Sequence, residues 1–158
     1  MSDTPTSTVR ERLGWPVTPE LYEKVRRLWI RHSLAEDRRD LPGLIETLTE
    51  DCVYEVVPTG QRWEGHEGAR SFYQTFLAAF PDVKFELKDI VIGPQGVVEV
   101  AEMTGTHSGP WAGLAPTGRA VRLLVVIHFP WDPAAQKFAG ERVYFDRAAL
   151  AAEGVTLG

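Results

Sequence analysis

The stretch FYQTFLAAFPDVKFELKDIV, residues 72 to 91, changes its hydrophobic period at one proline. Before Pro81 the apolar residues recur at helical spacing, with Phe72 and Phe76 on the same side. After Pro81 they alternate with polar residues, which is the period of a half-buried strand. The stretch therefore predicts a helix that stops before the proline and a strand over residues 83 to 92.

On the N-terminal side of this switch the patterns are mainly helical. Thr18 followed by Pro19 is typical of a helix start, since threonine caps the first turn and proline loses no hydrogen bond there. Helical spacing then continues through LYEKVRRLWIRHSLA, residues 21 to 35. Asp40 can cap a second, shorter helix, and CVYEVVP, residues 52 to 58, is typical of a strand.

On the C-terminal side the patterns are those of long strands. Three more strands are predicted over residues 97 to 107, 119 to 130 and 141 to 145, and a short helix follows. Helices come early in the chain and antiparallel strands late, which indicates an α+β fold. We expect a strongly bent sheet wrapped around the N-terminal helices, with a conical cavity between them.

Length and composition bound the organisation. We expect residues 1–15, rich in Ser, Thr and charge, to form a flexible arm, and residues 16–158 to form a single domain. The net charge of −5 argues against a nucleic-acid partner. The polar start, the lone Cys52 and the lack of a run of ~20 apolar residues predict a cytoplasmic protein with no membrane partner.

One predicted strand is apolar on both faces. VRLLVVIHF, residues 121 to 129, does not alternate as a strand with one wet face should. The helices can cover one face, and a second copy of the chain is our expectation for the other. The alternative is cover by the C-terminal segment of the same chain. We therefore predict a homodimer.

Three stretches resemble the SnoaL-like polyketide cyclase family of the NTF2-like superfamily. They are GQRWEGHEGARSFYQTFLAAFPD (60 to 82), GTHSGPWAGLAPTGRAV (105 to 121) and GERVYFDRAALAAEGV (140 to 155). The resemblance implies an NTF2-like α+β cone. The chain departs from the family pattern in its terminal helix, in a longer N-terminal arm and in a longer final hairpin, WDPAAQKFAG.

The resemblance also implies a reaction and its groups. In the cyclases that this chain is similar to, an Asp at the end of the final strand is the general acid/base for an intramolecular aldol closure, and Asp146 matches it. The alternative role for Asp146 is to cap the short helix that follows it. A His on the neighbouring strand is matched by His128. Tyr144 shares the strand face of Asp146, so its hydroxyl is a candidate donor to a ligand carbonyl.

The remaining candidates would bind the substrate, which we expect to be a small hydrophobic molecule. They are mostly aromatic side chains and polar groups near the expected mouth of the cone: Trp29, Tyr54, Trp63, His107, Trp111 and Arg142. Acid/base chemistry of this kind needs no cofactor, and HEGAR at residues 66 to 70 lacks the second His of a zinc motif. We expect neither a cofactor nor a metal.

Two other function classes stay open at this stage. The first is an epoxide hydrolase or isomerase on the same cone. The epoxide hydrolase would need paired carboxylates and an arginine around one water, and Arg142, Glu55 and Asp146 are its candidates. A non-catalytic binding or dimerisation module would leave no carboxylate in the cone with a perturbed pKa.

Overall fold

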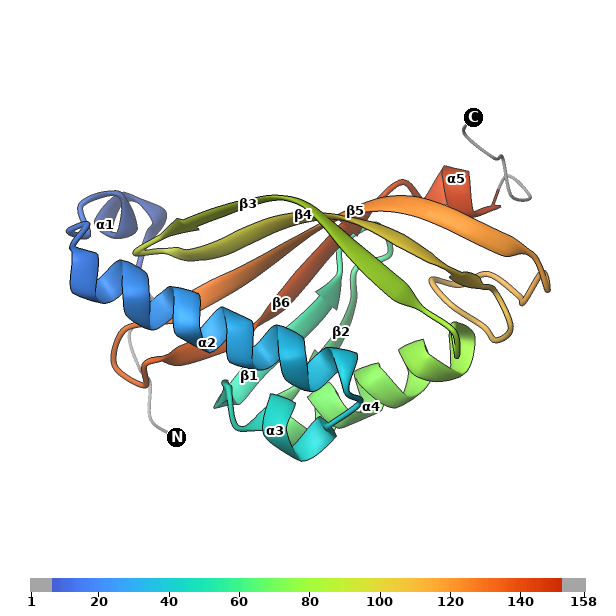
Figure 1. Cartoon of the computed structure of the whole chain (residues 1–158), viewed down its shortest axis with the longest axis horizontal. Helices are drawn as coiled ribbons and strands as arrows, with labels where there is room; N and C mark the ends of the chain where they lie inside the picture. The colour runs from blue at the N-terminus through green and yellow to red at the C-terminus, as the bar shows by residue number, and fades with distance from the viewer. Residues whose placement is uncertain (1–6, 152–158) are drawn as a thin grey trace.

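The structure is a computed structural model that describes residues 7–151 (Figure 1). Its helices and strands follow in the order α1 (Val9–Leu13), α2 (Pro19–Asp37), α3 (Leu41–Ile45), β1 (Leu48–Val56), β2 (Gln61–Glu64), α4 (Gly65–Ala79), β3 (Lys84–Gly93), β4 (Gly96–Thr106), β5 (Ala120–Asp132), β6 (Lys137–Phe145) and α5 (Arg147–Ala151).

The strands form one mixed sheet in the order β2-β1-β6-β5-β4-β3. The neighbours β1 and β6 are parallel, and the other pairs are antiparallel. The open sheet bends over α2, α3 and α4, which lie together along one side of it (Figure 1). The predicted α+β cone with a bent mixed sheet around N-terminal helices is confirmed.

The helix starts follow from local capping. The Thr18 hydroxyl accepts the Leu21 N–H at 3.1 Å, and Pro19 opens α2 as predicted. The Asp40 carboxylate accepts the Gly43 N–H at 3.1 Å at the start of α3. These caps fix where α2 and α3 begin.

The final hairpin is tighter than the sequence predicts. We expected WDPAAQKFAG to be a long connection, yet β5 continues to Asp132 and β6 starts at Lys137. The Asp132 carboxylate accepts the N–H groups of Ala134 and Ala135, at 2.9 and 3.0 Å, and closes a short turn. Strand β2, a short partner of β1, was also missed.

Strand β5 separates two different faces. Its side chains alternate between buried and more exposed positions along its length. Leu123 is 6% exposed on the inner face, whereas Leu124 is 62% exposed on the outer face. The helices therefore cover one apolar face only, and the predicted homodimer, which would cover the other, stays a prediction.

Gly140 lets β6 approach β1 closely. Its φ is +117°, and a Cβ there would lie 1.9 Å from the carbonyl oxygen of Val53. Only glycine fits this position. The close approach seats the next residue, Glu141, on the inner face, where it is 3% exposed.

The predicted arm is partly described. Residues 1–6 lie outside the described residues, whereas residues 9–13 form α1. A capping box stabilises the start of α1: the Thr8 hydroxyl accepts the Glu11 N–H, and the Glu11 carboxylate accepts the Thr8 N–H. The Gln95 side chain donates to the Arg12 carbonyl at 2.8 Å, which ties α1 to the β3–β4 turn. No helix within residues 7–151 is long and apolar enough to cross a membrane.

Candidate active site

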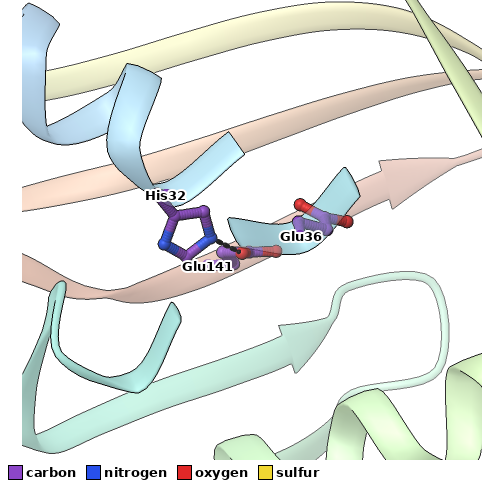
Figure 2. Close-up of side chains that lie close together, drawn as sticks. All are labelled: His32, Glu36 and Glu141. Atoms are coloured by element: carbon purple, nitrogen blue, oxygen red, sulfur yellow. Dashed lines mark hydrogen bonds and ion pairs between the residues drawn. The ribbon is translucent and has the colours of Figure 1, made fainter. Parts of the chain in front are cut away.

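Three titratable side chains converge between α2 and β6. His32 and Glu36 are four residues apart on α2, so they share one helix face. Glu141 reaches them from β6 on the opposite side (Figure 2). One ligand-type atom of each residue lies within 4.8 Å of those of the other two.

An apolar cavity borders this cluster at Glu36 and Glu141. Its walls are largely aromatic and come from α4, β3, β6 and the loop after β4: Phe72, Phe76, Phe85, Trp111 and Phe145. Among residues 7–151 the ionisable side chains in its wall are Glu36 and Glu141. We call it the apolar cavity.

A second, more polar cavity lies between α2 and strands β3 and β4. It is lined by Trp29, Asp37 and Glu99 among others, and it shares Glu36 with the apolar cavity. The space free of protein atoms, openings included, is ≈ 450 Å³ in the apolar cavity and ≈ 580 Å³ in the polar cavity. Glu36 therefore borders open space on two sides.

The Glu141 carboxylate has three polar partners, two of which are tyrosine hydroxyl donors. Its Oε1 accepts the Tyr73 hydroxyl at 2.7 Å and the Tyr54 hydroxyl at 3.1 Å, and it lies 2.8 Å from Nε2 of His32. Burial, and then the Glu141 charge, raise the pKa of Tyr54 and that of Tyr73 well above the ordinary value. Both hydroxyls therefore keep their protons and remain donors at neutral pH.

Glu36 differs from Glu141 in having no such anchors. Within residues 7–151 no hydrogen bond reaches its carboxyl group, which faces the two cavities. Burial raises the pKa of Glu36 well above its ordinary value, and the negative charges of Glu141, Glu99 and Asp37 raise it further. A carboxyl group with a raised pKa is a stronger base than an ordinary carboxylate.

Glu99 is a third inward carboxyl group. Burial, with help from Glu141, raises its pKa to about 7, although the hydrogen bond from Trp29 Nε1 at 3.1 Å acts in the opposite direction. Glu99 therefore places a group that titrates near neutral pH in the polar cavity, which Glu36 also borders.

The three residues His32, Glu36 and Glu141 include ligand types that metal ions use. Two of them, however, already have partners for the atoms concerned. Both ring nitrogens of His32 lie within hydrogen-bond distance of an oxygen, and Oε1 of Glu141 has three polar partners. This arrangement favours proton sharing over metal coordination.

Comparison with known proteins places the chain in a family. A family model described as SnoaL-like polyketide cyclase matches residues 21–154. The chain belongs to the SnoaL-like polyketide cyclase family. The resemblance read from the three sequence stretches is thereby confirmed. No curated protein matches the chain significantly.

Solved structures show the same fold at low sequence identity. A proposed SnoaL-like polyketide cyclase from Jannaschia sp. CCS1 is 21% identical, with a TM-score of 0.71 over 92% of this chain and 100% of that one. AclR of Streptomyces galilaeus, a proposed hydroxylase, is 23% identical, with a TM-score of 0.65 over 83% and 95%. TerC, crystallised with polyporic acid, is 13% identical, with a TM-score of 0.65 over 82% and 97%.

The SnoaL-like chain does not place its predicted catalytic residues at the cavity. Asp146 is exposed, and its Oδ1 accepts the Ala148 N–H at 2.9 Å, so it caps α5. His128 pairs with Arg142 across β5 and β6 on the outer face, and Tyr144 is 42% exposed there. The reason is strand alternation: the face that we assigned to the cavity points away from the helices.

The predicted binding residues divide into two groups. Tyr54 donates a hydrogen bond to Glu141, Trp111 lines the apolar cavity and Trp29 lines the polar cavity. Trp63 instead packs on Phe72 and Trp111, with ring centroids 5.2 and 6.4 Å away.

His107 is fully buried and lies apart from both cavities. Its ring stacks on Phe80 with centroids 5.3 Å apart, and burial lowers its pKa. The set of Glu55, Arg142 and Asp146, considered for hydrolysis, does not converge either. Glu55 and Arg142 are register partners on β1 and β6, whereas Asp146 caps α5.

Glu36, Glu141 and Tyr73 were not among the residues predicted for the site from the sequence. One signal for Glu141 was present, since it alternates with the apolar Val143 and Phe145 in the final strand. An apolar strand face is the one that packs on helices, so Glu141 should have been placed inside. Likewise, Glu36 follows His32 by one helical turn, on the side of α2 that faces the core.

Proposed function

We propose that this SnoaL-like chain is a cofactor-independent acid/base enzyme that acts on a small hydrophobic carbonyl compound, with Glu36 as the proton carrier. One observation carries the proposal. The Glu36 carboxyl has no hydrogen bond from residues 7–151, borders the apolar cavity and lies next to the anchored Glu141. The carboxyl group therefore faces open space beside a second carboxyl group without being held in place by hydrogen bonds, as a proton carrier needs.

The reaction that fits this pair is an intramolecular aldol closure. The ionised Glu36 removes a proton from a carbon between two carbonyl groups, and the resulting enolate carbon attacks a second carbonyl carbon of the same molecule. The new alkoxide then takes the proton back from Glu36. A raised pKa makes Glu36 a stronger base than an ordinary carboxylate and leaves its acid form populated for the return step.

The two cavities give this proton carrier separate surroundings. The aromatic walls of the apolar cavity suit a flat, hydrophobic substrate and exclude water from the enolate. On its other side Glu36 meets the polar cavity, where Glu99 and Asp37 also lie. Glu36 can therefore exchange its proton with solvent while the substrate stays in the apolar cavity.

A second function has one observation in its favour. The carboxyl groups of Glu36 and Glu141 come close enough to hold one water between them, which suits hydrolysis of an epoxide. Such hydrolases would also need an arginine that holds the water. Within residues 7–151 no arginine or lysine lines either cavity, so we rank this function below the aldol closure.

Turnover by matched variants tests the proposal. Aromatic methyl esters that carry a 1,3-dicarbonyl chain, and styrene oxide, would be offered to wild type, Glu36→Gln and Asp146→Asn. We expect cyclisation of an ester by wild type, a loss of about 10²–10⁴-fold in kcat for Glu36→Gln, and little change for Asp146→Asn. Full activity of Glu36→Gln would overturn the role of Glu36. Turnover of styrene oxide alone would favour the hydrolase.

A further inference from the structure

A continuous chain of buried polar groups runs from α3 to the active-site cluster. The Thr47 hydroxyl donates to the Leu44 carbonyl at 2.6 Å, and Nδ1 of His32 lies 2.6 Å from Thr47 Oγ1. Nε2 of His32 lies 2.8 Å from Oε1 of Glu141. The side chains of Thr47, His32 and Glu141 are 0%, 1% and 3% exposed, so protein groups must satisfy them.

The proton on Nδ1 follows from Thr47. A hydroxyl has one proton to donate, and Thr47 directs its proton to the Leu44 carbonyl. At 2.6 Å, Oγ1 of Thr47 can then only accept from Nδ1. His32 therefore carries a proton on Nδ1.

The protons at the other end follow from Glu141. Tyr54 and Tyr73 already donate to its Oε1, and both keep their protons because their pKa values are raised. An oxygen with that many donors is stabilised as the anion. Nε2 of His32, which faces the same oxygen, then also carries its proton. The hydrogen-bond pattern thus assigns a proton to each ring nitrogen of His32, which would make its contact with Glu141 an ion pair.

We propose that Thr47 is a positioning residue of the active site, which acts through His32 by keeping the imidazole doubly protonated and thereby holding Glu141 as a charge-paired anion beside Glu36. The consequence for catalysis rests on the proposed function of Glu36. The proton positions themselves do not, since they follow from the hydrogen bonds of the buried chain.

The charge of His32 matters because the pKa of Glu36 depends on the charges around it. From its own helix it faces Asp37 and His32, from β4 it faces Glu99, and from β6 it faces Glu141. The remaining titratable groups close to this centre are Arg39, Cys52, Tyr54 and Tyr73. Among those that line the cavities or touch Glu141, His32 is the group that can supply a positive charge. A neutral His32 would leave Glu36 in a more negative surrounding and raise its pKa further.

Nitrogen NMR of the histidine rings tests the proton positions directly. The full chain would be labelled with 15N at its four histidines, and His32→Gln would assign the signals. At pH 7 we expect both His32 nitrogens to show the shifts of protonated nitrogen. His107 provides an internal control because it is equally buried but its Nε2 has no partner within residues 7–151. We expect His107 to be neutral, since burial lowers its pKa.

Variants of Thr47 test its positioning role. Thr47→Val keeps the shape and removes the oxygen, so the His32 nitrogen that faces it should lose its proton and leave a neutral ring. Thr47→Ser restores the oxygen and should restore the double protonation. If Thr47→Val does not fold, Thr47→Ala serves as the oxygen-free variant. Carbon NMR titration of Glu36 should show a higher pKa in the oxygen-free variant than in Thr47→Ser.

The outcomes separate this inference from the proposed function. A wild-type His32 that is neutral at pH 7, with a proton on Nε2 alone, would overturn the inference even if Glu36→Gln loses turnover. Retention of both protons in the oxygen-free variant would overturn the role of Thr47. Conversely, an ordinary pKa for Glu36 would overturn the proposed function while leaving a doubly protonated His32 in place.

Discussion

The two faces of the bent sheet differ in their unusual residues: the inner face holds carboxyl groups among its apolar side chains, and the outer face exposes several apolar side chains. The inner face, which packs on the helices, carries the carboxyl groups of Glu99 on β4 and Glu141 on β6. The outer face exposes Val98, Leu124 and Tyr144, at 36%, 62% and 42%. Single exposed apolar side chains are common, but buried carboxyl groups are not.

The difference between the two faces supports the proposed acid/base function of the inner face. A buried carboxyl group lowers stability unless it is paired or neutral, and the fold supplies both solutions. Glu141 is paired with three polar partners, whereas Glu36 and Glu99 have raised pKa values. The outer face contains no comparable arrangement within residues 7–151, and there His128 has a pKa lowered by burial and by Arg142 and Arg12.

The largest expected effect comes from removing the inner carboxylate. Glu141→Leu keeps the approximate volume and leaves His32, Tyr54 and Tyr73 without their shared acceptor. We expect a loss of roughly 3–5 kcal/mol in the free energy of unfolding, measured by urea denaturation. The neighbouring outer-face variant Arg142→Ala should change it by no more than about 0.5 kcal/mol. Equal losses for the two variants would contradict the contrast between the faces.

A smaller effect is expected from two adjacent leucines of β5. Leu123→Ala opens space in the apolar cavity wall and should cost about 2–4 kcal/mol of unfolding free energy.

Leu124 lies on the outer face, so Leu124→Lys should instead dissociate the predicted homodimer, as followed by sedimentation equilibrium. A monomeric wild type, or a Leu124→Lys variant that remains dimeric, would show that the homodimer prediction is wrong for this face.

The fold was readable from the sequence because its signals are local. The change of period at Pro81, the caps at Thr18 and Asp40 and the alternation of the late strands each act within a few residues. The parallel pairing of β1 with β6 was not readable in this way, because it joins residues more than eighty positions apart. No local pattern reports such a contact.

The predicted residues Asp146, His128 and Tyr144 lie away from both cavities for a related reason. Alternation correctly separated Glu141 from Asp146, but the resemblance drew attention to Asp146 and to its neighbours on that face. The apolar partners of Glu141, namely Val143 and Phe145, were the better guide. The convergence of Glu36 with Glu141 could not be read at all, since it depends on how α2 crosses β6.

The smallest expected effect concerns how stability changes with pH. The pKa of Glu99 is about 7 in the folded chain and close to 4.5 when unfolded. Between these values the folded state binds more protons than the unfolded state, so stability falls as pH rises. We expect Glu99→Gln to remove roughly 2 kcal/mol of that fall between pH 4.5 and 7. Urea denaturation at several pH values measures it.

A second variant changes the same curve in the opposite direction. Trp29 donates to Glu99, and this hydrogen bond lowers the pKa of Glu99 against the effect of burial. Trp29→Phe removes the donor, so the pKa of Glu99 should rise above 7 and the fall in stability should continue to higher pH. The pH dependence of the unfolding free energy is compared rather than its absolute value, because the smaller Phe ring also loses packing contacts. If Glu99→Gln and Trp29→Phe both follow the wild-type pH dependence, then Glu99 has the pKa of an ordinary surface carboxyl group. The inner face would then not raise the pKa of this carboxyl group.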